Sequence, residues 1–198
     1  MSPAVPFAEI VRAVRSSASP QGMATKVIAV DGPGGAGKSS FALRLAEELG
    51  GVQVAHTDDF ASWDNPTDWW PRLLEELLEP LSRNERARYR RSDWGEPDHE
   101  PWGEVEAAEF LILEGVTASR EAFQPFLAYT VWIETPREVR LSRGLERDGE
   151  EARARWEEWM AAEDDYVRRE EPQARADLVV AGDRDLWLAH GKDVRQAP

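Results

Sequence analysis

A glycine-rich stretch early in the chain has the residue types and spacing that bind phosphate. Residues 32–39 read GPGGAGKS and match G-x-x-x-x-G-K-[ST] at every fixed position. Glycines let backbone amides wrap closely around phosphate oxygens, and the start of a following helix adds partial positive charge. Lys38 would reach the β- and γ-phosphates of ATP, and the Ser39 hydroxyl would ligate Mg²⁺. The predicted ATP-binding residues of this loop are Gly32, Pro33, Gly34, Gly35, Ala36, Gly37, Lys38, Ser39 and Ser40.

Carboxylates stand where two short apolar runs end. Asp58 and Asp59 follow one such run, and Glu114 follows another. Phosphoryl transfer needs a base for the attacking hydroxyl and acidic ligands for the metal. We therefore expect Asp58 to be the base, Asp59 to contact the substrate, and Ser39, Asp58 and Glu114 to hold Mg²⁺. The alternative is that these acids only begin helices, where the helix dipole favours them.

Four arginines recur at helical spacing further along the chain. Arg137, Arg140, Arg143 and Arg147 follow one another at intervals that put them on one face of a helix. Arginine can neutralise a transferring phosphoryl group and can close over a nucleotide as a lid. We expect Arg143 and Arg147 to act in catalysis with Lys38, and Arg140 to bind the nucleotide. A solvated face paired with neighbouring glutamates is the alternative.

Aromatic and polar residues between residues 63 and 102 are candidates for the acceptor site. Tryptophans are concentrated there, and their faces can stack on a base or a sugar. Packing of this region against the sheet is the alternative for each tryptophan. The predicted substrate-binding residues are Asp59, Asp64, Trp63, Arg90, Arg91 and Asp93. A structural role explains the lone histidine His56 better than a chemical one.

Short apolar runs alternate with amphipathic stretches, which indicates parallel strands joined by helices. We expect strands at residues 27–30, 52–55, 110–113, 129–133 and 178–181. Helices are expected at residues 7–14, 38–49, 69–81, 120–126, 137–147 and 150–171, and residues 82–105 read as mostly irregular. The elements predict an α/β chain with a three-layer α/β/α P-loop NTPase fold, a mostly parallel five-stranded sheet and a short helical lid. The motifs above then fall at the carboxyl ends of the strands, where such sheets bind ligands.

The composition narrows the class of protein. The 198 residues contain no cysteine, so disulfides and cysteine chemistry are excluded. A formal net charge of −14 disfavours general nucleic-acid binding. No apolar run approaches the ~20 residues of a membrane span, and the N-terminus lacks signal-peptide features. We expect a cytoplasmic protein without membrane or nucleic-acid partners.

The chain resembles the uridine kinase and phosphoribulokinase-like branch of P-loop, NMP-kinase-like small-molecule kinases. The resemblance rests on DGPGGAGKSS, TDDF, LILEGV, the arginine helix and the last strand RADLVV. It implies that Asp58 is the general base and helps hold Mg²⁺, and that Glu114 is a metal-site acid. It also implies that Arg140, Arg143 and Arg147 form the lid and that Asp64 holds ribose hydroxyls.

Departures from the family pattern affect the substrate more than the reaction. Ala61 stands where the family has tyrosine, and the lid loop is reduced to Asp148-Gly149-Glu150. Only Tyr89 and His99 are available, loosely placed, for the residues that recognise a pyrimidine. The expected organisation is an N-terminal helix and linker (residues 1–24), a P-loop kinase domain (25–185, lid about 137–171) and a C-terminal tail (186–198).

The favoured function is ATP- and Mg²⁺-dependent transfer of a γ-phosphate to a hydroxyl of a small molecule, with a nucleoside as acceptor. A nucleoside monophosphate, sugar or sugar-acid kinase is the alternative, because Arg90 and Arg91 could bind an anionic acceptor. A regulatory nucleotide switch with slow NTPase activity belongs to another class, and the chain has no N-K-x-D base-reading motif to support a GTP switch. A homo-oligomer is compatible with the sequence, and the N-terminal helix could pack on the domain or mediate assembly.

Overall fold

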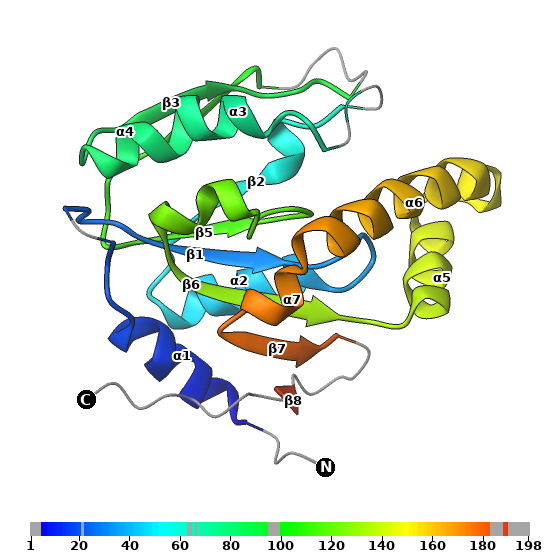
Figure 1. The fold of residues 1–198 in the computed structure, drawn as a ribbon, viewed down its shortest axis with the longest axis horizontal. Helices are drawn as coiled ribbons and strands as arrows, with labels where there is room; N and C mark the ends of the chain where they lie inside the picture. The colour runs from blue at the N-terminus through cyan, green and yellow to red at the C-terminus, as the bar shows by residue number, and fades with distance from the viewer. Residues whose placement is uncertain are drawn as a thin grey trace.

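The computed structural model describes residues 5–20, 22–62, 65, 67–94, 100–182 and 188–189. Its main sheet has the strand order β2-β5-β1-β6-β7-β8 (Figure 1). The strands are β1 (Lys26–Asp31), β2 (Gln53–His56), β5 (Phe110–Glu114), β6 (Leu127–Glu134), β7 (Leu178–Ala181) and β8 (Leu188–Ala189). All neighbours pair in parallel except β8, which runs antiparallel to β7. The predicted five parallel strands are confirmed, and β8 adds a short sixth.

One face of the sheet is covered by α1 (Phe7–Ser16) and α2 (Lys38–Glu48) (Figure 1). Alternate strand residues point to this face, as the period of two in a strand requires. Ile28 and Val30 of β1 belong to this core, together with Phe41 and Leu45 of α2. This packing holds β1 and α2 in place relative to each other, and the glycine-rich loop connects them.

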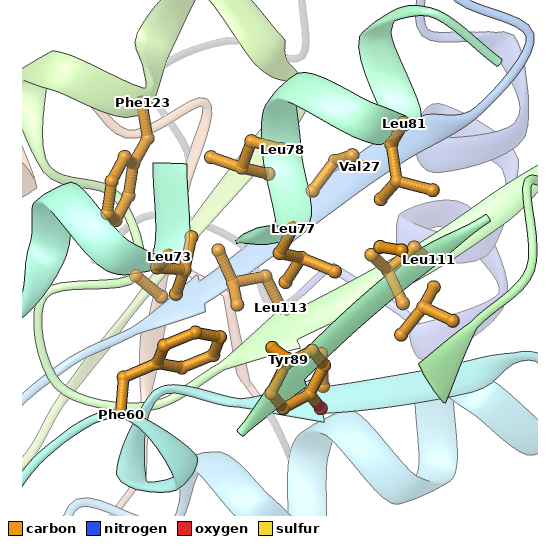
Figure 2. Packing of buried hydrophobic residues seen from close by; sticks show 14 of the residues in the cluster. Val27, Phe60, Leu73, Leu77, Leu78, Leu81, Tyr89, Leu111, Leu113 and Phe123 are labelled. Atoms are coloured by element: carbon orange, nitrogen blue, oxygen red, sulfur yellow. The ribbon is translucent and has the colours of Figure 1, made fainter. Parts of the chain in front are cut away.

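The opposite face is covered by a helical segment with a π-helical turn at its centre. The segment consists of α3 (Trp70–Leu73), η2 (Leu74–Leu78) and α4 (Glu79–Ser82), and it replaces the single helix predicted for residues 69–81. Its leucines pack on the strand residues that α1 and α2 do not cover: Val27, Leu111 and Leu113 (Figure 2). The leucines in this contact are Leu73, Leu77, Leu78 and Leu81.

A second, two-stranded antiparallel sheet follows this helical segment. Its strands are β3 (Ala87–Arg90) and β4 (Trp102–Val105), so the prediction that residues 82–105 are mostly irregular is wrong for these two stretches. Ala87, Tyr89 and Val105 point inward and are buried, whereas the arginines between them face outward. The alternation is that of a half-buried strand, but its outward residues are charged and its length is only four residues.

Helices near the carboxyl ends of the main strands complete the fold. They are η1 (Thr57–Asp59), η3 (Glu121–Phe126), α5 (Arg137–Asp148), η4 (Glu150–Ala152), α6 (Arg153–Glu170) and α7 (Pro172–Arg175). The helix predicted at residues 120–126 is a 3₁₀ helix because Pro125 lies inside it. The long charged helix predicted at residues 150–171 is divided into η4 and α6, and α7 follows. None of the described helices combines the length and the apolar character needed to cross a membrane.

Candidate active site

The glycine-rich loop lies between the end of β1 and the start of α2, where the motif requires it. Gly35 and Gly37 adopt positive φ angles of 74° and 100°. A Cβ on Gly32 would lie 2.4 Å from the Ile133 carbonyl oxygen, and one on Gly35 would lie 2.6 Å from the Arg140 carbonyl oxygen. Only glycine fits these positions, so the tight backbone loop that cradles phosphate is built into the packing.

The loop borders a cavity of ≈ 640 Å³. The predicted residues that line it are Gly34, Gly35, Gly37, Lys38, Ser39, Ser40, Asp58, Glu114, Arg143 and Arg147. Gly32, Pro33 and Ala36 lie in the loop without lining this cavity, and the Pro33 carbonyl accepts a hydrogen bond from Lys38 Nζ at 3.0 Å. The structure thus brings the phosphate loop, two acids and two arginines to one cavity.

Glu114 is the centre of a polar cluster at the start of α2. Ser39 Oγ donates to one of its carboxylate oxygens at 3.2 Å, and His56 Nδ1 lies 2.8 Å from the other. Burial would raise the pKa of Glu114, but hydrogen bonding to His56 and the charge of Lys38 outweigh it and hold the pKa below its ordinary value. The lowered pKa favours the ionised form of Glu114, which is the form in which a carboxylate can bind a cation. His56, for which the sequence favours a structural role, is thus the hydrogen-bond partner of a candidate metal ligand.

Asp58 lines the cavity beside the loop. Asp58 is open to the cavity, yet desolvation by the surrounding protein raises the pKa of its carboxyl; the charge of Lys38 opposes the rise, and Glu114 adds to it. The neighbouring Asp59 turns away, because its Oδ2 accepts hydrogen bonds from Tyr89 Oη at 2.9 Å and Arg91 Nε at 3.3 Å. The two acids thus separate into one facing the phosphate loop and one facing the β3–β4 sheet.

The four lid arginines of α5 have different surroundings. Arg143 donates to the carbonyls of Gly35 at 3.2 Å and Gly182 at 3.0 Å while lining the cavity. Arg147 lines it too and pairs with Asp148 at 2.7 Å. Arg137 pairs with Asp164 near the surface. Arg140, predicted to bind the nucleotide, is buried outside the cavity lining and pairs with another acid of the lid.

A second cavity, of ≈ 580 Å³, adjoins the first at Trp94. Arg90, Arg91 and Asp93 line it as predicted for an acceptor site, and Arg72 and Glu76 of the helical segment join them. Trp94 lines both cavities, and its Nε1 donates to the Asp58 carbonyl at 2.9 Å. The predicted substrate residues Trp63 and Asp64 lie outside the described residues, as does His99.

Two tryptophans of α6, Trp156 and Trp159, line the main cavity and were not predicted. Trp159 also contacts Trp94 across the cavity, with ring centroids 5.9 Å apart. They lie on the helix face whose buried residues include Glu163 and Tyr166. The signal in the sequence was the helical spacing of Glu163 from these aromatic residues, which indicates a shared buried face. The many charged residues of this segment obscure that pattern.

Asp31, at the end of β1, is a buried junction between the phosphate loop, the segment after β5 and α6. Its Oδ1 accepts from the amides of Gly32 at 2.7 Å and Thr117 at 2.9 Å. Its Oδ2 accepts from the Ser119 amide and hydroxyl at 2.9 and 2.7 Å and from Tyr166 Oη at 2.7 Å. Burial raises the pKa of Asp31, although the hydrogen bonds from Ser119, Tyr166 and Gly32 oppose the rise.

The parallel sheet, the glycine-rich loop at its strand–helix junction and the acid-lined cavity beside it define a P-loop NTPase fold of the kinase-like type. A family model described as an AAA domain matches residues 28–173. The chain belongs to this family. The match spans the phosphate loop, both acidic strand ends and the lid.

Solved structures with the same fold include several kinases. A possible uridine kinase from Bacillus stearothermophilus is similar with a TM-score of 0.63 and 21% identity, covering 87% of this chain and 96% of that one. A protein assigned as a fructose transport system kinase from Silicibacter sp. TM1040 has a TM-score of 0.60, 19% identity and coverages of 87% and 93%. D-glycerate 3-kinase from Cryptococcus neoformans var. grubii has a TM-score of 0.55, 14% identity and coverages of 93% and 96%. No curated protein matches the chain by sequence.

Proposed function

We propose that the protein is an ATP- and Mg²⁺-dependent phosphotransferase that moves the γ-phosphate of ATP to a hydroxyl of a small molecule. One observation carries the proposal: Asp58, whose side chain is accessible from the cavity, lines the same cavity as Lys38 and the phosphate loop. A kinase needs a base where the acceptor hydroxyl meets the terminal phosphate, and Asp58 is the acid that faces this region.

The residues of the loop fit a nucleotide phosphate. Gly34, Gly35 and Gly37 line the cavity, and a Cβ on Gly35 would collide with the backbone of α5. Ser39 and Glu114, which are hydrogen-bonded at 3.2 Å, would hold Mg²⁺. No group of three or more histidine and acidic side chains arranged for a metal occurs within the described residues, and Mg²⁺ at such sites takes most of its ligands from phosphates and water. When bound, Mg²⁺ neutralises charge on the phosphates.

Asp58 would accept the proton of the acceptor hydroxyl. Desolvation by the surrounding protein raises the pKa of the carboxyl above the ordinary value, which brings it nearer to the pH at which a general base is most effective. Arg143 and Arg147 line the cavity from the lid and would stabilise charge on the transferring group. Lys38 would contact the phosphates, since its Nζ already lies at the loop, 3.0 Å from the Pro33 carbonyl oxygen.

A nucleoside is the acceptor that we favour. Trp94 joins the two cavities beside Asp58, and an aromatic face suits a base or a sugar ring. An anionic acceptor, such as a nucleoside monophosphate or a sugar acid, is the second candidate because Arg72, Arg90 and Arg91 line the adjoining cavity. Glu76 and Asp93 line it too, which reduces its positive charge and keeps this candidate second.

The experiment that tests the proposal is ADP release from Mg-ATP in the presence of nucleosides, nucleoside monophosphates and small sugars or sugar acids. We expect one acceptor to raise turnover well above the background rate, and Asp58→Asn to reduce the stimulated rate by about 10²–10⁴-fold. Asp165→Asn is the matched control, since Asp165 is exposed on α6 and pairs with Arg168. ATP binding without stimulation by any acceptor would favour the regulatory switch instead.

A further inference from the structure

Glu163 of α6 is a buried carboxylate that contacts the phosphate loop directly. Its Oε1 accepts a hydrogen bond from the Gly34 amide at 2.8 Å. Its Oε2 accepts one from Arg140 Nη1 at 3.3 Å. The side chains of Glu163 and Arg140 are only 2% and 6% exposed. A carboxylate in this position is unusual, because the loop amides are the groups that bind phosphate oxygens.

Glu163 uses groups that a nucleotide would also use. Burial raises the pKa of Glu163, and the charge of Lys38 is the first of the effects that oppose the rise, followed by the Gly34 amide and Arg140. Lys38 is the residue that reaches the β- and γ-phosphates in such loops. The Gly34 amide that Glu163 occupies is one of the loop amides that could otherwise donate to a phosphate oxygen.

The surroundings of Glu163 hold α6 against the loop. Tyr166, one turn further along α6, donates to Asp31 at 2.7 Å. Trp156, two turns earlier, lies where a Cβ on Gly34 would come within 3.2 Å of its ring, and the same Cβ would lie 2.9 Å from Glu163 Oε1. Figure 1 shows α6, in orange and yellow, running past the carboxyl ends of the central strands beside α5. The absence of a side chain at Gly34 thus permits close contact between the loop and α6.

We propose that Glu163 is an internal anion that fastens α6 to the phosphate loop and competes with the terminal phosphate of the nucleotide for the Gly34 amide. The inference rests on the proposed nucleotide binding and adds a control of affinity to it. When the terminal phosphate takes the amide, Glu163 keeps Arg140 as its counter-charge, so the carboxylate does not remain unpaired. Nucleotide binding would then weaken the attachment of α6 to the loop. Trp156 and Trp159, which line the cavity, belong to this helix.

The test compares the affinities of the wild-type chain, Glu163→Gln and the matched control Glu158→Gln for Mg-ATP and Mg-ADP by calorimetry. Glu158 is exposed on the same helix, so its substitution removes one charge without touching the loop. We expect Glu163→Gln to bind Mg-ATP about tenfold more tightly, because a nearby like charge is removed. The gain for Mg-ADP is smaller, and Glu158→Gln stays within about twofold of the wild type because exposed charges are screened.

Thermal unfolding of each variant shows whether it is folded. Glu163→Asp keeps the charge but shortens the reach to Gly34, and it serves as the second variant, with an expected gain of about threefold as only part of the competition is lost. Equal or weaker Mg-ATP binding by a folded Glu163→Gln or Glu163→Asp would overturn the inference while leaving the proposed function intact, provided that the wild type binds. If neither wild type nor variants bind Mg-ATP, the proposed function and this inference fail together.

Discussion

The phosphate-loop side of the site and the proposed acceptor side, around the second cavity, are held in different ways. Around the loop, Asp31 and Glu163 are almost completely buried, with exposures of 0% and 1%, and both accept hydrogen bonds from backbone amides. On the acceptor side, the Arg91–Asp59 pair has side-chain exposures of 38% and 19%. Removing one partner of a buried charge lowers the stability of the fold strongly, because the other charge remains buried without a partner. Exposed ion pairs are screened by solvent and contribute little to stability.

This difference indicates which side of the site is rigid and which side can adapt to a ligand. The loop is fixed by buried acids and by glycines that the packing requires, so its geometry suits the constant part of the reaction, the nucleotide. The proposed acceptor side is built from partly or fully exposed side chains of β3, the segment after it and the helical segment, whose pairs can exchange partners with a ligand. Substitutions on the two sides are therefore expected to differ in both size and kind of effect.

The largest effect is expected for Asp31→Asn. Both carboxylate oxygens accept from backbone amides, so an asparagine NH₂ must face an N–H group whichever way it turns. We expect a loss of about 3 kcal/mol or more in the free energy of unfolding, because buried donors lose a charged acceptor. Chemical denaturation measures it.

Asp177→Asn is the matched control for this prediction. Asp177 also lies beside a strand end, but the Thr130 amide and hydroxyl both donate to its Oδ2 alone. An asparagine oxygen can take that place, so the loss should be about 1 kcal/mol. Equal losses of stability in the two variants would contradict the view that the fold needs both carboxylate oxygens of Asp31 as acceptors.

An intermediate effect is expected for Gly35→Ala on the loop. Its φ of +74° strains any other residue, and the new Cβ would lie 2.6 Å from the Arg140 carbonyl oxygen. We expect about 1–3 kcal/mol of lost stability and Mg-ATP affinity reduced at least tenfold, since the backbone must shift. Gly50→Ala has a φ of +106° with open space around it, so it should lose stability without losing nucleotide affinity. Loss of affinity in both variants would mean that strain alone, and not the close approach, matters.

The smallest effect is expected for Tyr89→Phe on the acceptor side. The change removes one hydrogen bond, from Tyr89 Oη to Asp59 at 2.9 Å, and leaves the ring against Phe60 (Figure 2). We expect a loss of about 1 kcal/mol in stability, a raised KM for the acceptor and an unchanged KM for ATP. Steady-state kinetics with each substrate varied in turn measures this. A changed KM for ATP alone would remove the distinction between the two sides.

The sequence predicts the phosphate-loop side well because the chemistry there is carried by the backbone. A fixed motif at a strand–helix junction determines the loop, and the alternating apolar runs determine the order of strands and helices around it. Asp58 and Glu114 follow from their places at strand ends, where a parallel sheet brings them to one edge.

The rest depends on contacts between segments far apart in the chain, which no local pattern reports. The β3–β4 sheet was missed because its outward residues are charged and its strands are short. Glu163 lies 129 positions from Gly34, and its role appears only when α6 is packed on the loop. Arg140 shares a helical face with Arg143, yet a shared face does not decide which side chain turns to the cavity and which one pairs with a buried acid.

The most direct test of the central claim is to identify the phosphorylated product by mass spectrometry after incubation with Mg-ATP and the acceptor that stimulates ADP release. We expect the acceptor to gain one phosphoryl group at a hydroxyl, in proportion to the ADP formed, and Asp58→Asn to make almost none. Release of ADP with inorganic phosphate as the only other product would contradict the account, because it would identify a hydrolase whose cavity does not deliver the phosphoryl group to a second substrate.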